Sequence, residues 1–350
     1  MPMPDPLRTI TAERVAALAA GATLLGSGGG GPVALGELLL RRALPRRGVI
    51  VRRARDLPLQ AMVVHVGVFG APDVLAERLI NPADMAAAAR AVVEQVGGEL
   101  AAVGALEIGG LNALAAVLAA HELDLPIIDG DLMGRAFPSV YKTTMSVAGH
   151  PAAPVALVGP GGDTVVVPTC SDRLVGGLLD SAAAALGGLA ALAIYPTSAA
   201  TLASVGVPGT LSSCVSLGEA FLSAPAGDIP VLADRLGGSF IFQGRVDELR
   251  PREADAPGSV TLTGAGGSVA RIDLLEEFLA VTVNGITLAR TPDVIVVLSS
   301  TSGAVVGTAQ VRLGQALGIV ALPALHTWPP GSDAVVGPAA FGLDLDVVTR

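Results

Sequence analysis

The sequence is poor in charged residues and has almost no lysine. Of its 350 residues 15% are charged, against about a quarter in a typical soluble domain, and Lys142 is the only lysine. The formal net charge is −9 and the basic residues form no cluster, which argues against a nucleic-acid-binding surface. Hydrophobic residues make up 51% of the chain. A large buried core is therefore expected, and disorder is excluded.

Cysteine is also scarce. Cys170 and Cys214 are the only two cysteines, so a disulfide scaffold is excluded, and their spacing is not that of a zinc site. Arg173 near Cys170 is the only basic residue close to either in the sequence, so a thiolate nucleophile is a minor alternative. The sequence leaves the roles of both cysteines open.

The sequence favours neither a signal peptide nor a membrane span. Arg8 and Glu13 interrupt the N-terminal segment, which lacks the apolar core of a signal peptide. The stretch 181–218 has no charged residue and is long enough to cross a bilayer. It consists largely of Ala, Gly, Ser and Thr, and Pro196 and Pro208 interrupt it, so a buried core segment is the better interpretation. We expect a cytoplasmic protein without membrane contact.

Helical and apolar strand patterns alternate through the first part of the chain. They predict a three-layer α/β domain over 1–160, with a largely parallel sheet. The expected helices are 11–20, 32–44, 81–96 and 113–121, and the expected strands are 49–51, 61–68 and 125–128.

The second part of the chain has a different pattern, and it predicts a β-rich α+β domain over 161–350. A strand at 164–167 and an Ala/Gly-rich helical part to about 236 come first. The Asn284-Gly285 pair favours a hairpin, because both central positions of a type I′ turn need positive φ. The Pro- and Gly-rich piece 151–162 is the expected linker. Further strands are expected at 239–246, 259–263, 278–283, 286–289, 294–298 and 318–322.

A glycine run near the N-terminus is the first candidate binding element. Backbone N–H groups in such a loop can surround an anionic or carbonyl oxygen, and Pro32 suits the start of the next helix. The spacing also fits a dinucleotide fingerprint, but only a very short strand precedes it and no acidic residue follows about twenty positions on. A flexible connection is the third possibility. We expect a substrate-binding loop and no nucleotide cofactor, with the residues Gly26, Ser27, Gly28, Gly29, Gly30 and Gly31.

The second candidate directly follows the strand 125–128, where ligands collect in open α/β sheets. Asp129 and Asp131 are two positions apart, so in extended backbone both carboxylates point to one face. Their repulsion should raise one pKa, or a divalent cation should lie between them. Arg135 is the nearest counter-charge in the sequence and can orient a planar substrate. A turn with a structural Asp–Arg pair is the simpler alternative.

The third candidate is Glu107, an acid within an apolar stretch. A buried carboxylate is costly unless it is paired, so Glu107 faces either a polar site or solvent. Asn112 either caps the helix that follows or binds a ligand. Among the scattered histidines His65 is the most site-like, because its strand ends near the same loops.

These segments together resemble the family DUF917, once known only as a domain of unknown function and now associated with S-methyl thiohydantoin desulfurase. The similarity runs in order along nearly the whole chain. Its most specific part is the string Asp129-x-Asp131-x-Met133-Gly134-Arg135-Ala136-Phe137-Pro138, preceded by the glycine loop 24–32 and by Glu107-x-Gly109-Gly110-x-Asn112. The segments 208–212, 291–295, 312–315, 320–324 and 337–342 are also similar. The chain departs from the family at Leu132, where a glycine is expected, and at 275–279, which is usually more polar.

The resemblance implies hydrolysis of a C–S bond on a five-membered heterocycle. Water would add to the carbon that bears the S-methyl group, and methanethiol would leave to give a hydantoin. Asp131 or Asp129 would be the base, alone or through a metal-bound water, and Glu107 the acid. Arg135 and Asn112 would orient the ring, and the glycine loop would donate N–H groups.

Two other functions remain open at this point. The chain is similar to proteins joined to hydantoinase/oxoprolinase-type enzymes, so it could be a non-catalytic partner or ligand-binding subunit of one. A nucleotide-binding oxidoreductase would need a true strand before Gly26. A closed homo-oligomer is expected from the low surface charge.

Overall fold

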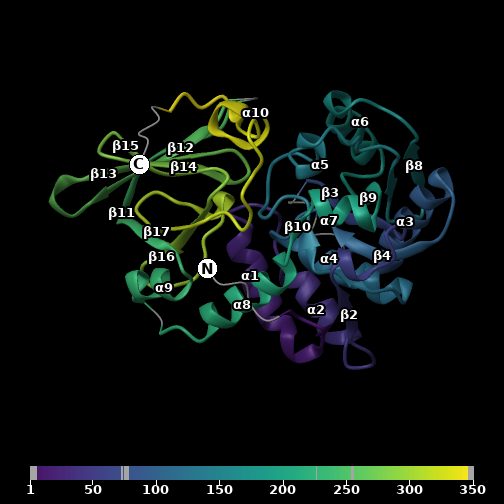
Figure 1. The fold of residues 1–350 in the computed structure, drawn as a ribbon. Coiled ribbons are helices and arrows are strands. Elements are labelled where there is room, and N and C mark those ends of the chain that lie inside the picture. The colour runs from purple at the N-terminus through teal and green to yellow at the C-terminus, as the bar shows by residue number, and fades with distance from the viewer. Residues whose placement is uncertain (1–5, 72–73, 75–78, 226, 254–255, 346–350) are drawn as a thin grey trace.

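The computed structural model describes residues 6–71, 74, 79–225, 227–253 and 256–345, and it contains two large sheets (Figure 1). The first has eight strands in the order β1-β2-β5-β4-β3-β9-β7-β8, and the second has seven in the order β15-β14-β13-β12-β11-β17-β16. Both expected fold classes, an α/β part followed by a β-rich part, are confirmed.

The middle of the eight-stranded sheet is parallel and its two ends are antiparallel. Strands β2, β5, β4 and β3 run parallel, because helices carry the chain back between β3 and β4 and between β4 and β5. The strands are β1 (Thr9–Ile10), β2 (Val49–Arg52), β3 (Met62–Gly70), β4 (Leu100–Ala105), β5 (Ile127–Ile128), β7 (Val155–Val158), β8 (Thr164–Val167) and β9 (Leu189–Ser198).

Helices cover both faces of this sheet. Alternate residues of β3 point to opposite sides: Val64 and Val66 pack in the core under α3 and α4, and Val63 in the core under α6 and α7. This gives the three layers that the sequence predicts. The helices are α1 (Val15–Leu25), α2 (Ala34–Ala43), α3 (Pro82–Val96), α4 (Leu111–Leu123), α5 (Thr144–Val147), α6 (Asp172–Ala185), α7 (Ala199–Val205), α8 (Thr210–Leu222), α9 (Ile229–Arg235) and α10 (Asp333–Val336).

The expectation of a continuous helical part from 168 to 236 is wrong for one segment. Residues 189–198 form β9, which lies between β3 and β7 in the sheet. Their alanines suggest a helix, but a strand paired on both sides and covered on both faces needs only small apolar residues, and burial overrides the intrinsic preference. The sheet thus continues past the expected linker, while the domain division at 160 stays a prediction.

The uncharged stretch 181–218 is divided among α6, β9, α7, β10 (Val207–Pro208) and α8. Strand β10 pairs with β6 (Gly130–Asp131) in a small two-stranded sheet. Within the described part of the chain, no helix combines the length and apolar character that a membrane crossing requires.

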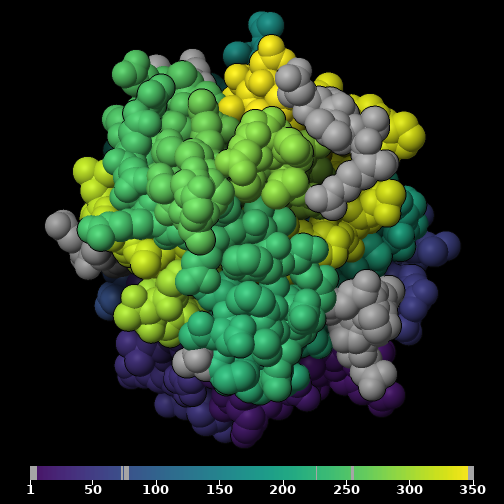
Figure 2. Space-filling view, turned by 90° about the vertical axis from the view of Figure 1, so that its left-hand side faces the viewer, coloured from purple at the N-terminus to yellow at the C-terminus, as the bar shows by residue number. Residues whose placement is uncertain are grey.

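The seven-stranded sheet is antiparallel throughout and encloses its own core. The expected hairpin is confirmed: Asn284 and Gly285 both have positive φ between β14 and β15. Figure 2 shows these strands above the helical segment that precedes them in the chain. The strands are β11 (Ser239–Arg250), β12 (Gly258–Gly264), β13 (Val269–Leu274), β14 (Phe278–Val283), β15 (Ile286–Arg290), β16 (Val294–Ser299) and β17 (Ala316–Leu322).

Helices α1 and α8 pack closely near the centre of the molecule (Figure 1). A Cβ atom on Gly21 would lie 1.8 Å from the Cys214 carbonyl oxygen, and one on Gly218 would lie 1.8 Å from that of Ala17. Only glycine allows the two backbones this approach. The contact holds the start of α8 beside the segment that contains the two aspartates.

Candidate functional site

The three candidate segments meet at one place. The N–H group of Gly110 donates to the Ala22 carbonyl at 2.7 Å, that of Leu111 to Gly30 at 2.8 Å, and that of Ala136 to Leu25 at 3.0 Å. The glycine loop, the segment 107–112 and the segment 129–137 are therefore tied together by backbone hydrogen bonds.

Glycines make this meeting possible. A Cβ atom on Gly110, which has φ of 63°, would lie 2.0 Å from the Gly30 carbonyl oxygen, and one on Gly109 would lie 2.6 Å from the Ala136 nitrogen. Gly28, Gly30 and Gly31 also have positive φ. The glycine run is thus a close contact between segments, and its function as a binding loop stays a prediction.

Glu107 is buried at this junction, only 6% exposed. Its Oε1 accepts a hydrogen bond from Asn112 Nδ2 at 2.5 Å, and its Oε2 accepts one from the Phe137 N–H at 3.3 Å. Burial raises the pKa of Glu107 to about 8, against the effect of these two hydrogen bonds. At neutral pH the fold therefore favours the protonated acid.

Asn112 does not cap a helix, so that alternative is wrong. Gly110 occupies the N-cap of α4, and Asn112 lies in the first turn. Its side-chain oxygen accepts from the Val68 N–H at 2.7 Å while its nitrogen donates to Glu107. Asn112 thus fixes the orientation of the Glu107 carboxyl group against β3.

Asp131 lies next to Glu107, fully buried. Its Oδ2 accepts three backbone hydrogen bonds, from Ile108 at 2.9 Å, Met133 at 3.1 Å and Gly134 at 2.8 Å. Its Oδ1 is buried without a hydrogen bond of normal geometry, although the hydroxyl group of Thr210 lies close enough to lower the pKa of Asp131. Burial is the larger effect and raises this pKa to about 7. Oδ1 is the oxygen left to receive a proton.

The two aspartates do not form a pair, and the expectation that their repulsion raises a pKa is wrong. Asp129 faces α8: its Oδ1 accepts from the Ser212 N–H at 2.9 Å, and its Oδ2 accepts from the Ser212 hydroxyl at 2.6 Å. Asp129 thus satisfies a free N–H group at the start of α8, and burial is the main cause of the raised pKa of Asp131.

Arg135 does not pair with either aspartate. It is 1% exposed, and it donates from Nε to the Ala136 carbonyl, and from its two terminal nitrogens to those of Asp293 and Phe278. Burial lowers the pKa of Arg135 to about 10, and Glu277, Asp293 and Glu107 counteract that effect. The guanidinium group joins the second domain to the site.

Glu277 is the residue that the sequence analysis missed. It precedes β14, is 2% exposed, and its Oε1 would lie 2.4 Å from a Cβ atom on Gly29. Glu107 is near enough to raise the pKa of Glu277 and Arg135 near enough to lower it. An acid just before the apolar run 278–281 was the available signal, because a charge there is costly to bury without a purpose.

Two further predicted residues lie in the core. The Ser27 hydroxyl donates to the Ile295 carbonyl and accepts from the Ile295 N–H, each at 3.0 Å, which joins the two domains. His65 Nδ1 lies 3.0 Å from the Tyr195 carbonyl oxygen, and burial lowers the pKa of His65 to about 4, so it is neutral. Binding of substrate by either residue stays a prediction.

The site fits a metal ion poorly. Among the described residues no group of three or more His, Cys, Asp and Glu side chains is arranged to hold one. Asp131 offers one free oxygen, and Asp129 turns its carboxylate to Ser212. Burial raises the pKa of both Cys170 and Cys214, which favours the thiols.

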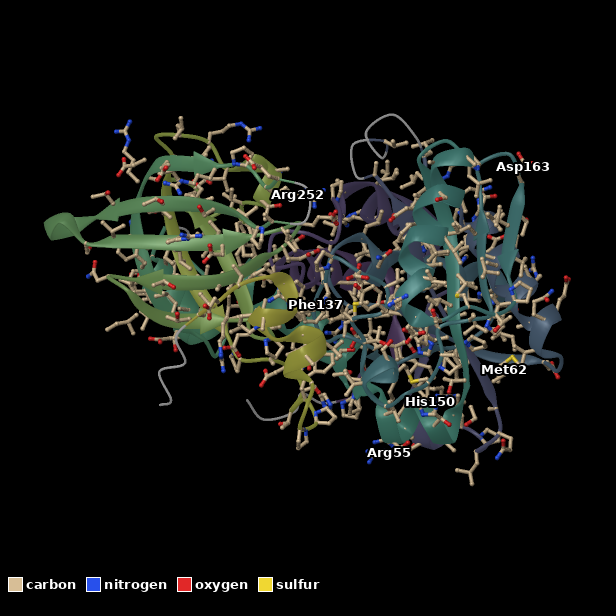
Figure 3. All side chains as sticks on the ribbon, turned by 90° about the horizontal axis from the view of Figure 1, so that it is seen from above. Arg55, Met62, Phe137, His150, Asp163 and Arg252 are labelled. Carbon is tan, nitrogen blue, oxygen red and sulfur yellow. The ribbon has the colours of Figure 1, made fainter. Side chains whose placement is uncertain are left out.

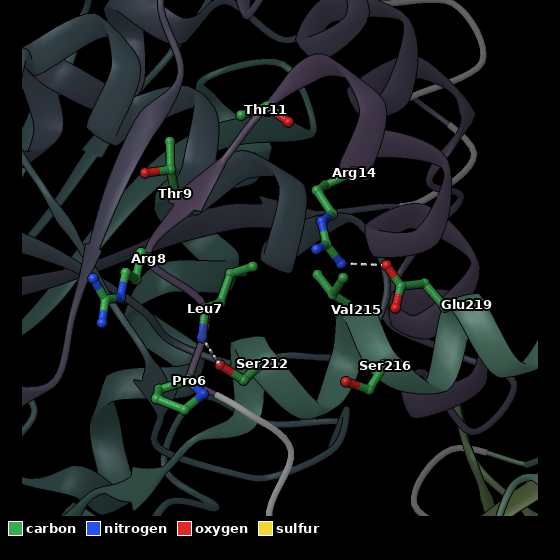
Figure 4. A pocket seen from close by; sticks show the side chains of 10 residues that line it. All are labelled: Pro6, Leu7, Arg8, Thr9, Thr11, Arg14, Ser212, Val215, Ser216 and Glu219. Carbon is green, nitrogen blue, oxygen red and sulfur yellow. Dashed lines mark hydrogen bonds and ion pairs between the residues drawn. The ribbon is translucent and has the colours of Figure 1, made fainter.

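A surface hollow lies beside this region (Figure 4). It has a volume of about 570 Å³ and lies where residues 6–14 pass over α8. Arg14 and Glu219 form an ion pair at its wall, and Ser212 lines it while holding Asp129. Glu107, Asp131 and Glu277 do not line this hollow. They lie instead at the junction of the two halves, where Phe137 is drawn in Figure 3.

The fold and these contacts define a class of two-domain proteins with carboxyl groups from both domains buried at the junction. The chain belongs to the S-Me-THD-like family, as its motifs predict: the model of the family's N-terminal domain matches residues 13–169, and that of the C-terminal domain matches residues 171–349. A crystal structure of a protein from Chromobacterium violaceum, from a structural genomics consortium, is similar to it. The two are 26% identical, with a TM-score of 0.78 over 91% of this chain and 92% of the other. No curated protein matches the chain.

Proposed function

We propose that the protein is a hydrolase that cleaves the C–S bond of an S-methylated thiohydantoin-type heterocycle, releasing methanethiol and a hydantoin. Family membership supports the substrate class. The observation that carries the proposal is that Glu107 and Asp131 are buried side by side where the three candidate segments meet, each with its pKa raised toward neutrality. A proton donor and a proton acceptor that both work near pH 7 are what this hydrolysis needs.

The two acids take different roles because their hydrogen bonds differ. Three backbone N–H groups at one oxygen favour the ionised form of Asp131, which acts as the base toward water through Oδ1. Glu107 keeps its proton and donates it to the ring nitrogen as water adds to the carbon that bears sulfur. Arg135 and Asn112 orient the ring, and the glycine loop supplies N–H groups. Asp129 supports α8.

Substrate reaches these groups by separation of the two domains at the junction. Asp131 is fully buried and Glu107 nearly so, so the heterocycle needs space that the closed arrangement fills. Among the polar contacts that must separate, Ser27 bonds to Phe278 and Ile295, and Gly28 to Thr308. Arg135 also donates to the carbonyl groups of Phe278 and Asp293. Closure around the substrate would also exclude water from the tetrahedral intermediate.

The test is a thiol-release assay with S-methylated thiohydantoins. D131N and E107Q should each reduce kcat by about 100-fold or more, the usual contribution of a general base or acid. D129N is the matched control, two residues away, and should keep turnover within a few-fold. Full turnover in D131N and E107Q would contradict the assignment. Release by the purified chain alone would exclude the non-catalytic partner function.

A further inference from the structure

Glu277 has an unused polar atom at the centre of the molecule. Its carboxyl group is 98% shielded from solvent by the fold, and its Oε2 has no hydrogen-bond partner among the described residues. A buried carboxyl oxygen without a partner lowers the stability of the fold. Such a group calls for an explanation, and a catalytic role is one.

A structural role for Glu277 is poorly supported by its surroundings. Arg135 is a cation whose charge acts on Glu277, but its Nε and terminal nitrogens donate to the carbonyl groups of Ala136, Asp293 and Phe278. Within the described ranges, no ion pair closer than 4.0 Å includes Glu277. Glu277 therefore makes no direct ion pair with Arg135, although its charge supports the ionised form of that buried guanidinium group.

The position of Glu277 depends on the glycine loop. Any side chain at residue 29 would strike it, because a Cβ atom there would lie 2.4 Å from Glu277 Oε1 and 2.7 Å from the Glu276 carbonyl oxygen. The N–H group of Gly30 faces the same carboxyl group. Gly29 thus leaves room for an acid from the second domain beside the loop that carries Gly30 and, through it, the Glu107 segment.

The charges around Glu277 favour its protonated form. Burial raises the pKa of Glu277 well above its ordinary value, and Glu107 and Glu276 raise it further. Arg135 and the Gly30 N–H group act in the opposite direction. The site therefore holds a second carboxylic acid, supplied by the other domain.

We propose that Glu277 is a catalytic acid that protonates the sulfur atom as it leaves. This inference rests on the proposed function and adds the residue that this function lacks. In this scheme Glu107 protonates the ring nitrogen, and Asp131 keeps the proton of the attacking water until the C–S bond has broken, so sulfur takes its proton from a third group. Methanethiolate is a more basic leaving group than an aryl thiolate, so its departure gains more from an acid that protonates sulfur as the C–S bond breaks.

Three carboxyl groups, one as a base and two as acids, account for every proton in the reaction. Asp131 takes a proton from water as the oxygen bonds to carbon, and Glu107 gives one to the ring nitrogen. When the C–S bond breaks, its electron pair stays on sulfur, which takes the proton of Glu277 to give methanethiol. The new hydroxyl group returns a proton to Glu107 and becomes the hydantoin carbonyl. Asp131 then releases its proton to solvent, and Glu277 regains one.

The test compares two leaving groups in E277Q and in the control E276Q. Glu276 is the adjacent acid, but it is exposed and pairs with Arg252 at 3.4 Å. With an S-methyl substrate, E277Q should lower kcat by about 100-fold or more. With an S-nitrophenyl substrate, whose thiolate leaves without protonation, E277Q should remain within a few-fold of the parent protein. E276Q removes only a neighbouring charge and should remain within a few-fold of the parent protein with both.

Equal losses with both substrates, or no loss with S-methyl, would overturn the role of Glu277 and leave the proposed function standing. A folded parent protein that releases thiol from neither substrate would overturn both proposals. E277D, which keeps an acid on a shorter side chain, should recover part of the S-methyl turnover. If E277Q does not fold, E277D decides: it should impair S-methyl cleavage more than S-nitrophenyl cleavage, and equal impairment would overturn the inference.

Discussion

At the scale of single residues, burial governs the chemistry of this protein. Glu107, Asp131 and Glu277 all lose water when the chain folds, and burial is the largest cause of the raised pKa in each. Hydrogen bonds then separate their roles, since Asp131 accepts three backbone N–H groups at one oxygen. In the proposed mechanism, carboxyl groups of the same chemistry thus act as a base and two acids.

The stability of the protein should report the buried proton of Glu107. Its pKa rises from 4.5 in the unfolded chain to about 8 in the fold. Between these values the folded protein holds a proton that the unfolded chain releases, so stability falls as pH rises toward 8. E107Q has no such proton. The difference between its free energy of unfolding and that of the parent protein should therefore rise by on the order of 4 kcal/mol in favour of E107Q between pH 5 and pH 9.

Chemical denaturation at several pH values measures this difference. Asp131 and Glu277 keep part of the pH dependence in E107Q, so the quantity of interest is the divergence of the two curves. E94Q, a substitution of an exposed glutamate on α3, should follow the parent protein at every pH. Parallel curves for E107Q and the parent would mean that Glu107 is ionised in the fold.

At this scale the sequence predicts the participants better than the pairings. Glu107, Asn112 and Asp131 stand out because acids and amides are rare in apolar stretches, and in the structure they lie close together. The predicted pairing of Asp129 with Asp131 is wrong, because Ser212, 83 residues away in the sequence, donates a hydrogen bond to Asp129. Glu277 was noted only as a departure from the family, since no local pattern connects it with Glu107.

At the scale of elements, the contact between α1 and α8 positions the aspartates. It brings the start of α8 to Asp129, and its closest points are at Gly21 and Gly218. Glycine inside a helix is intrinsically unfavourable, by roughly 1 kcal/mol relative to alanine. Its presence at both contact points shows that close packing outweighs this loss.

Gly218→Ala should therefore destabilise the protein, against the helix preference of alanine. The new Cβ atom would lie 1.8 Å from the Ala17 carbonyl oxygen, so the two helices must move apart. The expected loss is about 3 kcal/mol, at the upper end for an overpacked contact. Denaturant unfolding measures it.

Gly177→Ala on α6 is the matched control. No heavy atom lies within 4 Å of its Cβ position, so this substitution should stabilise the protein by roughly 0.5–1 kcal/mol. Stabilisation by G218A of the same size would mean that α1 and α8 are not in close contact in solution.

The elements also show where sequence patterns fail to predict secondary structure. Strand β3 alternates between two cores and was expected at nearly its observed position. Strand β9 was not expected, because its alanines favour a helix. It forms a strand because it pairs with β3 and β7, which are distant in sequence. The intrinsic preference of a segment has little influence on its conformation where long-range strand pairing and burial are strong.

At the scale of the whole molecule, the site depends on polar contacts between two domains, made by Ser27 and Arg135 among others. The Ser27 carbonyl accepts from the Phe278 N–H at 2.8 Å, and its hydroxyl bonds both backbone groups of Ile295. A two-residue hairpin or a periodic strand is visible in a sequence, but a contact across 268 positions is not. The junction could therefore be predicted only through the family resemblance.

If substrate enters by separation of the domains, the amide protons of Phe278 and Ile295 should exchange with solvent faster than those inside the second sheet. The opening needed is local, so its free energy should be smaller than that of global unfolding. The Val260 and Ile272 amide groups, on the paired strands β12 and β13, provide the internal reference. Hydrogen exchange followed by NMR measures all four, and S27A should accelerate the first two selectively. Addition of hydantoin, the proposed product, should slow them. Exchange of Phe278 and Ile295 as slow as the reference, in the free protein and in S27A alike, would mean that the junction opens only when the whole protein unfolds.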